Sequence, residues 1–212
     1  LDAIKTKMTR IEQNFNQAFW NGREYRSVDY EGETDDRAHA LAVVSGLAAP
    51  EQYDAIRQVF KTQEHSSAYM EKYVGEALYM MGLPDDALTR TKRRFADMTN
   101  HRYSTLWEDW RIGGSGGGTI NHAWSGGALT LLVQYGAGIA PIEAGFKTYQ
   151  VAPQLGSLQS IKTTVPSVAG DIRIALNQES KSLLLHLDSP EGTTAIVVLP
   201  KRDTAEVTKI LA

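Results

Sequence analysis

The stretch Pro141-Ile142-Glu143-Ala144-Gly145-Phe146-Lys147-Thr148-Tyr149-Gln150-Val151 separates two parts of the chain whose apolar residues recur at different spacings. Before this stretch, apolar residues recur every three or four positions, which is typical of amphipathic helices. After it, short apolar runs are separated by clusters of Pro, Gly, Ser and Asn, which is typical of strands. The sequence therefore predicts a helical domain over residues 1–143 and a β domain over residues 144–212.

The helical period is clearest at the start of the chain, where Ile4, Met8, Ile11, Phe15 and Phe19 would lie on one helix face. The predicted helices cover approximately residues 4–19, 38–47, 53–60, 68–81, 84–98 and 122–135. Their connections are short, so neighbouring helices are expected to pack antiparallel as αα-hairpins. No G-x-G-x-x-G motif follows a strand, which makes a dinucleotide-binding α/β fold unlikely.

The second part contains five short strand candidates rich in Val, Ile, Leu, Thr and Tyr. They cover residues 147–151, 161–165, 171–176, 182–187 and 194–199. Turn-forming residues between them favour a small antiparallel β domain. The expected fold class is thus mainly α, with a smaller all-β domain at the C-terminal side.

Composition excludes several classes of function. The formal net charge of -3 gives no global attraction to nucleic acid or anionic membranes. The absence of cysteine rules out disulfides, thiolate zinc sites and cysteine nucleophiles. No window approaches the roughly 18 apolar residues of a membrane span. The chain opens on Leu1 rather than Met, directly in a helical pattern, so we expect the true N-terminus to lie upstream.

Residues 105–127 differ in composition from the rest of the chain. They hold three of the four tryptophans, Trp107, Trp110 and Trp124, together with a glycine-rich run at 113–118. Proteins bind sugars with this mixture, because aromatic faces stack on the C–H face of a pyranose while polar side chains bond its hydroxyls.

Glu108 lies between Trp107 and Trp110, where partial desolvation can adapt a carboxyl group to acid or base catalysis. The plainer interpretation makes these tryptophans core residues and Glu108 a cap of the following turn. The glycine-rich run lacks the Lys-Ser/Thr of a phosphate loop, so a flexible connector is its default interpretation. His122 alone would more often be a polar residue at a helix start than a ligand.

Other catalytic classes find little support. The five histidines are His39, His65, His101, His122 and His186, and none forms an HExxH motif or another close pair. Metal catalysis is therefore disfavoured, and no metal site or cofactor is expected. Ser125 is not part of a G-x-S-x-G motif and follows no strand, which argues against a serine hydrolase.

Two segments resemble a known family. His-Arg-Tyr-Ser-Thr-Leu-Trp-Glu-Asp-Trp at 101–110 and Gly-Thr-Ile-Asn-His-Ala-Trp-Ser-Gly-Gly at 118–127 resemble the C-terminal part of bacterial α-L-rhamnosidases. The resemblance extends to shorter segments on both sides and covers roughly Trp20 to Arg173. These further segments are residues 35–43, 68–74, 137–141 and 145–146.

The resemblance implies an (α/α)6 barrel followed by a C-terminal antiparallel β-sandwich. About six helices make half of such a barrel, so residues 1–143 are expected to be its C-terminal half. The family hydrolyses terminal α-L-rhamnosides with inversion and without a cofactor. Glu108 matches its general base, which activates water, and His122 matches a sugar-binding histidine.

Further substrate contacts are expected from four residues. Trp107, Trp110 and Trp124 would form walls of the pocket, and Asn121 would hold sugar hydroxyls together with His122. Asp36, at the start of an earlier helix, is also expected to face the pocket on the basis of the resemblance.

The family's general acid lies in a motif upstream of this segment, and the sequence contains no convincing copy of it. We therefore expect the isolated chain to be inactive and to need the missing N-terminal part of its own chain. An uncovered apolar barrel face would also promote self-association. Family members are often exported, which favours a periplasmic or secreted location.

Two rival functions remain open. The first is a non-catalytic carbohydrate-binding or scaffold module of the same fold, which would keep the tryptophans and need no acid partner. The second stays within enzymes, because other (α/α)6 glycosidases and polysaccharide lyases with similar toroids share the architecture. A lyase would need Tyr or His as its base, near an arginine-rich subsite for acidic sugars. Arg102 and Arg111 flank the Glu108 motif without forming such a cluster, so the lyase is disfavoured.

Overall fold

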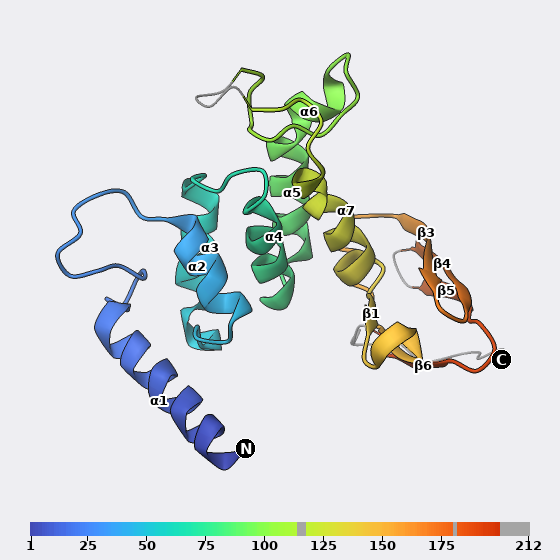
Figure 1. Ribbon diagram of the computed structural model, residues 1–212, viewed down its shortest axis with the longest axis horizontal. Coiled ribbons are helices and arrows are strands. Elements are labelled where there is room, and N and C mark those ends of the chain that lie inside the picture. The colour runs from blue at the N-terminus through green and yellow to red at the C-terminus, as the bar shows by residue number, and fades with distance from the viewer. Residues whose placement is uncertain (114–117, 180–181, 200–212) are drawn as a thin grey trace. The chain divides into compact units, whose positions relative to one another are not determined.

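The computed structural model describes residues 1–113, 118–179 and 182–199 (Figure 1). The chain divides into two compact units, Leu1–Ala128 and Leu129–Ala212, and each is described by itself. The first unit is helical and the second consists mainly of β-strands. This confirms the predicted combination of a helical part followed by a β part.

The helices of the first unit lie close to the segments that the spacing of apolar residues predicted. They are α1 (Asp2–Phe19), α2 (Asp36–Val44), α3 (Tyr53–Thr62), α4 (Glu71–Met80), α5 (Pro84–Arg94) and α6 (Ala96–Asn100), with a 3-10 turn at Pro50–Gln52. The Asp35 side chain caps α2 by accepting a hydrogen bond from the Arg37 amide. Gly82 ends the α4 segment with a φ of 73°, a value that glycine adopts without strain.

Helices α2 to α5 form the interior of this unit, and α4 packs against both α2 and α5. Val43, Ile56, Val74 and Leu78 are buried there. Helix α1 differs, because none of its residues is buried. Ile4 and Met8, on its apolar face, are 62% and 63% exposed.

Two predicted helices are interrupted. The segment 84–98 is two helices, because Phe95 has non-helical dihedral angles (φ −92°, ψ 3°) and lies buried between them. The segment 122–135 begins with a 3-10 turn at Ala123–Gly126, continues as α7 (Gly127–Leu131) and ends as a π-helix at Leu132–Gly136. The paired glycines Gly126 and Gly127 weaken regular helix at this point.

The second unit holds two three-stranded sheets within the described residues. One has the order β1 (Ile139–Pro141), β2 (Thr148–Val151) and β6 (Thr194–Val197). The other has the order β3 (Ser160–Ser167), β4 (Gly170–Gln178) and β5 (Leu183–Asp188). Both sheets contribute to one apolar cluster that includes Ile139, Tyr149, Val151, Ile172 and Ile174.

The expectation of purely antiparallel pairing is wrong for one pair of strands. The second sheet is an antiparallel meander, but β6 pairs in parallel with β2. The long connection through β3, β4 and β5 returns the chain to the same end of β2, which is what a parallel pair requires. Strand β1, of three residues, was not predicted, because so short a segment carries no readable period.

The boundary between the units lies between Ala128 and Leu129, whereas the sequence placed the domain boundary at 143/144. The reason is that Val133 and Ala137 pack with the apolar cluster of the β unit, so the π-helical segment belongs to that unit. The assignment of residues 1–143 to half a barrel and of 144–212 to a β-sandwich stays a prediction. In the described part of the chain, no helix is both long and apolar enough to traverse a bilayer.

Candidate active site

Two backbone hydrogen bonds place Glu108 beside the segment that carries His122. The Glu108 amide donates to the Thr119 carbonyl over 2.9 Å, and the His122 amide donates to the Leu106 carbonyl over 2.8 Å. The segments 106–108 and 119–122 are therefore clamped side by side. This arrangement belongs to the helical unit and depends on main-chain groups.

The Glu108 carboxylate is held through one of its oxygens. Oε2 accepts a hydrogen bond from the Thr119 amide over 2.9 Å and a longer one from the Thr119 hydroxyl over 3.3 Å. His122 Nδ1 lies 2.9 Å from the Thr119 hydroxyl and 3.7 Å from Oε2. The side chains of Glu108 and His122 are 34% and 32% exposed, so solvent or a ligand can reach both.

The three tryptophans of this region occupy different environments. Trp107 is 4% exposed and packs with Ala68, Phe95 and Met98, so the structure places it in the core. Trp110 is half-buried, donates from its indole nitrogen to the Ser66 carbonyl and lies under the Arg94 guanidinium. Neither presents the open aromatic face that a pocket wall requires, contrary to expectation.

Trp124 is the exposed tryptophan, at 44%. Its ring centre lies 4.4 Å from that of His122 and 5.5 Å from that of Tyr69, which is itself an exposed residue. Its indole nitrogen donates to the Glu108 carbonyl over 3.3 Å. Trp124, His122 and Tyr69 thus form a partly open aromatic group next to Glu108, and Asn121 is exposed beside it.

Asp36 does not face an open site. It is fully buried, and its carboxylate binds Arg90 over 2.5 Å and accepts from the His65 amide over 3.1 Å. Arg90 also donates to Glu71 over 2.6 Å and to the Phe60 carbonyl. A buried carboxylate is stable only when its charge is compensated, so this position serves the packing of α2, α4 and α5.

Sequence reasoning missed two residues that matter here. Arg90 had a signal, because it is a charged residue beside Ala87 and Leu88 on the apolar side of a predicted helix. Such a residue must meet buried opposite charge. Thr119 carried no such signal in the sequence, because an exposed threonine after a glycine-rich run is an ordinary turn residue. Its contact with Glu108 depends on the way the two segments fold together.

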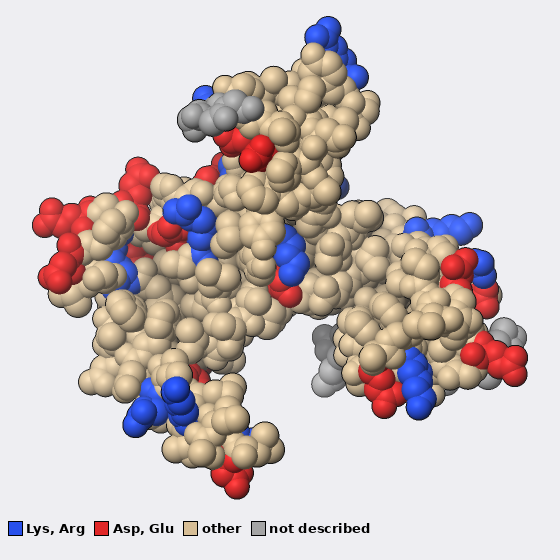
Figure 2. Space-filling model, in the orientation of Figure 1, with Lys and Arg blue, Asp and Glu red and all other residues tan. Residues whose placement is uncertain are grey.

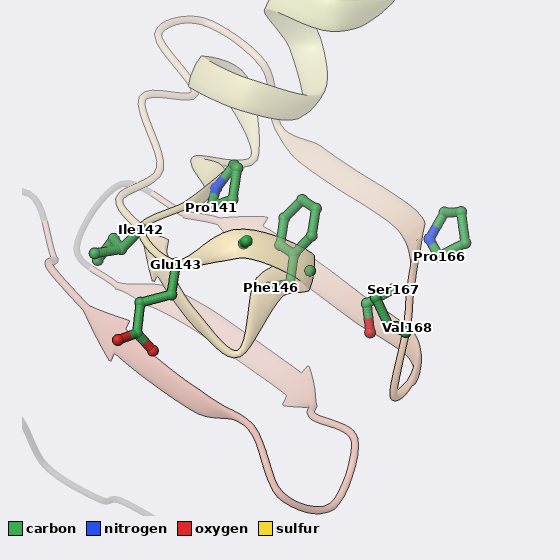
Figure 3. Close-up of a pocket in the computed structure, with 9 residues that line it drawn as sticks. Pro141, Ile142, Glu143, Phe146, Pro166, Ser167 and Val168 are labelled. Carbon is green, nitrogen blue, oxygen red and sulfur yellow. The ribbon is translucent and has the colours of Figure 1, made fainter.

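A shallow hollow of about 500 Å³ lies in the β unit, lined by residues 141–146 and 166–168 (Figure 3). Figure 3 shows the Phe146 ring rising between Pro141 and Pro166, while the Glu143 side chain points away from that ring. The Glu143 carboxylate accepts from the Thr148 hydroxyl, and the Ser167 hydroxyl donates to the Gly170 carbonyl. The lining of the hollow therefore offers apolar surface rather than convergent polar groups, unlike a catalytic pocket.

Charged side chains of both signs are scattered over the face shown in Figure 2. Within the described residues, no group of three or more His, Asp or Glu side chains is arranged to hold a metal ion. The Glu108 group therefore remains the candidate active site, with a carboxylate, an imidazole and an open aromatic ring.

Solved structures share this fold. An α-L-rhamnosidase from Dictyoglumus thermophilum matches with a TM-score of 0.79 and 17% identity, over 96% of this chain and 24% of that one. The family GH78 rhamnosidase of Bacillus sp. GL1 matches with a TM-score of 0.74 and 21% identity, over 94% of this chain and 23% of that one. The fold is thus one found in glycoside hydrolases.

The sequence comparisons point to the same family. Residues 138–210 match the model of the bacterial alpha-L-rhamnosidase C-terminal domain. An alpha-L-rhamnosidase of Formosa agariphila is 27% identical over 119 residues, which are 52% of this chain and 13% of that protein. Both matches relate the chain to bacterial α-L-rhamnosidases, and residues 138–210 resemble the C-terminal domain of that family. It spans a quarter or less of the length of these relatives.

Proposed function

We propose that the chain is part of a glycoside hydrolase that cleaves terminal α-L-rhamnosides with inversion, and that Glu108 is its general base. The observation that carries the proposal is the state of the Glu108 carboxylate. It is anchored through Oε2, remains about one-third exposed, and lies beside His122 and the open ring of Trp124.

Inverting hydrolysis uses two carboxyl groups about 6.5–9.5 Å apart, with a water molecule between the base and the anomeric carbon. Glu108 takes a proton from this water as its oxygen bonds to the anomeric carbon. The glycosidic bond breaks at the same time, and the leaving oxygen receives a proton from a general acid. We assign that acid to the upstream part of a longer chain.

The neighbouring side chains would bind the sugar. Trp124 and Tyr69 offer exposed aromatic carbon to the C–H face of a 6-deoxyhexose. His122 and the exposed Asn121 would bond its hydroxyls. Trp107 and Trp110 would act indirectly, because their packing with Phe95 supports the segment that carries Glu108.

In this proposal the helical unit is the C-terminal half of an (α/α)6 barrel, and the β unit is the following β-sandwich. The uncovered apolar face of α1 supports this, since Ile4, Met8 and Ile11 are exposed where further barrel helices would pack. By the same reasoning, the isolated chain would be inactive on rhamnosides and would self-associate through that face.

The test replaces Glu108 in the longer protein. Glu108→Gln should lower kcat on an aryl α-L-rhamnoside roughly 100- to 10,000-fold, the usual range for loss of a general base. Glu108→Ala should regain turnover with added azide, which attacks without a base and leaves a rhamnosyl azide of inverted configuration. The matched control is Glu143→Gln, another carboxylate bonded to a threonine hydroxyl, in the β unit.

Activity of Glu108→Gln within a few fold of the unmodified protein would refute the base assignment. An azide product of retained configuration would refute inversion. The alternative of a non-catalytic carbohydrate-binding or scaffold module rests on the same exposed aromatic group of Trp124 and Tyr69. It requires that the longer protein bind rhamnosides without turning them over.

A further inference from the structure

We infer that Thr119 is the positioning residue of this site, and that it fixes Glu108 so that Oε1 is the oxygen that receives the proton. The inference rests on the proposed base role of Glu108. It adds a residue and an atom that this role alone does not specify.

Thr119 binds Glu108 at three points. Its carbonyl accepts from the Glu108 amide, its own amide donates to Oε2 over 2.9 Å, and its hydroxyl lies 3.3 Å from the same oxygen. The terminal torsion of a glutamate is broad and turns easily. Two donors on one oxygen restrict that rotation, because turning the carboxylate would break both bonds.

The Thr119 hydroxyl also connects Glu108 to His122. The direct separation of His122 Nδ1 from Oε2 is 3.7 Å, which is too long for a hydrogen bond. The hydroxyl lies 2.9 Å from Nδ1 and has a single proton. When that proton points to Glu108 Oε2, the hydroxyl oxygen of Thr119 accepts a hydrogen bond from the Nδ1–H group of His122. Nε2 of the neutral ring then carries a lone pair for a sugar hydroxyl.

The other carboxylate oxygen is left for the water. Among the residues that the structure describes, every hydrogen bond to the Glu108 carboxylate ends on Oε2. An oxygen that already accepts two hydrogen bonds is a poorer proton acceptor than one that accepts none. The proton from the attacking water therefore goes to Oε1, and Oε2 serves as the anchor.

The experiment removes the hydroxyl and keeps the shape. In the longer protein, Thr119→Val should lower kcat roughly 10- to 100-fold, the effect of losing a hydrogen bond to a charged group, with KM changed less than about threefold. Thr119→Ser, which retains the hydroxyl, should stay within about threefold of the unmodified kcat. Thr148→Val removes the equivalent hydroxyl from Glu143 and should leave kcat unchanged.

A second measurement separates positioning from damage to the fold. In a Glu108→Ala background with azide the base is bypassed, so adding Thr119→Val should change the azide rate by less than about threefold. An equal loss in both backgrounds would overturn the inference. So would a Thr119→Val variant whose KM rises while kcat holds, or a Thr119→Ser variant as slow as Thr119→Val. Failure of the base assignment is visible separately, as retained activity in Glu108→Gln.

Discussion

The helical unit contains two clusters of carboxylate side chains that differ in burial and in hydrogen bonding. In the first, Asp36 and Glu71 are buried around Arg90, which is 3% exposed. In the second, Glu108 is partly open and is held by the amide and hydroxyl of Thr119. Every carboxylate oxygen of Asp36 and Glu71 accepts a hydrogen bond inside the protein. Among the described residues, Glu108 Oε1 and His122 Nε2 have no such partner, and in the proposed mechanism they face the water and the substrate.

Arg90 shows how completely the buried cluster is satisfied. Its guanidinium donates to Asp36, to Glu71 and to the carbonyls of Phe60 and Gln63. Burial disfavours its charge, but the hydrogen bond to Glu71 and the charges of Glu71 and Asp36 outweigh burial and raise the pKa of Arg90. Helices α2, α4 and α5 are thereby joined at one point.

The largest expected effect on stability comes from breaking this cluster. Arg90→Ala removes the cation that Asp36 and Glu71 share in the interior and should cost about 3–5 kcal/mol in the free energy of unfolding. Urea unfolding followed by far-UV circular dichroism measures it. Arg93→Ala is the matched control on the same helix, because its pair with Glu64 is at the surface and is worth less than about 1 kcal/mol. Equal losses in the two variants would remove the distinction between the clusters.

An intermediate effect is expected on acidification, through His39. This buried ring accepts from the Tyr25 amide at Nε2 over 2.8 Å and bonds the Asp35 carbonyl at Nδ1 over 2.7 Å, so the neutral ring satisfies both contacts. Burial lowers the pKa of His39 below its usual 6.5. The unfolded chain therefore binds this proton more tightly. The stability contributed by the neutral ring is present above about pH 6.5 and is lost as the pH falls below it.

The measurement is the urea midpoint between about pH 7 and pH 5, which brackets the ordinary histidine range. The midpoint should fall in the unmodified chain, and the fall should be smaller in His39→Asn. An equally large fall of the urea midpoint in that variant would assign the effect to other groups.

The smallest expected effect is on the stability of Glu108→Gln. The side chain is partly exposed, and glutamine retains an oxygen that can accept from the Thr119 amide. The free energy of unfolding should therefore change by less than about 0.5 kcal/mol. A loss as large as that of Arg90→Ala would mean that Glu108 belongs to the structural type of carboxylate.

The sequence predicted those parts of the fold that depend on local periodicity. Helices α1 to α5 and strands β2 to β6 fall where the hydrophobic pattern placed them. The break at Phe95 and the parallel pairing of β6 with β2 were not predicted, because each depends on tertiary packing. The sequence predicted the apolar face of α1 but not its exposure, because periodicity does not show what covers a helix face.

The candidate site shows the same limit. The composition of residues 105–127 indicated a mixture of side chains suited to binding a sugar. The fold brings Glu108, His122 and Trp124 together. The sequence could not tell that Trp107 is buried while Trp124 is open. It also could not show that Asp36 pairs with Arg90, a partner 54 positions away.

The backbone clamp between residues 106–108 and 119–122 also has an evolutionary consequence. Its two bonds hold the main chain on either side of the intervening segment, residues 109–118. Lengthening a connection is cheap, since doubling its length costs only about 0.6 kcal/mol in closure entropy. We therefore expect changes of length between Glu108 and Thr119 to leave the proposed base in place.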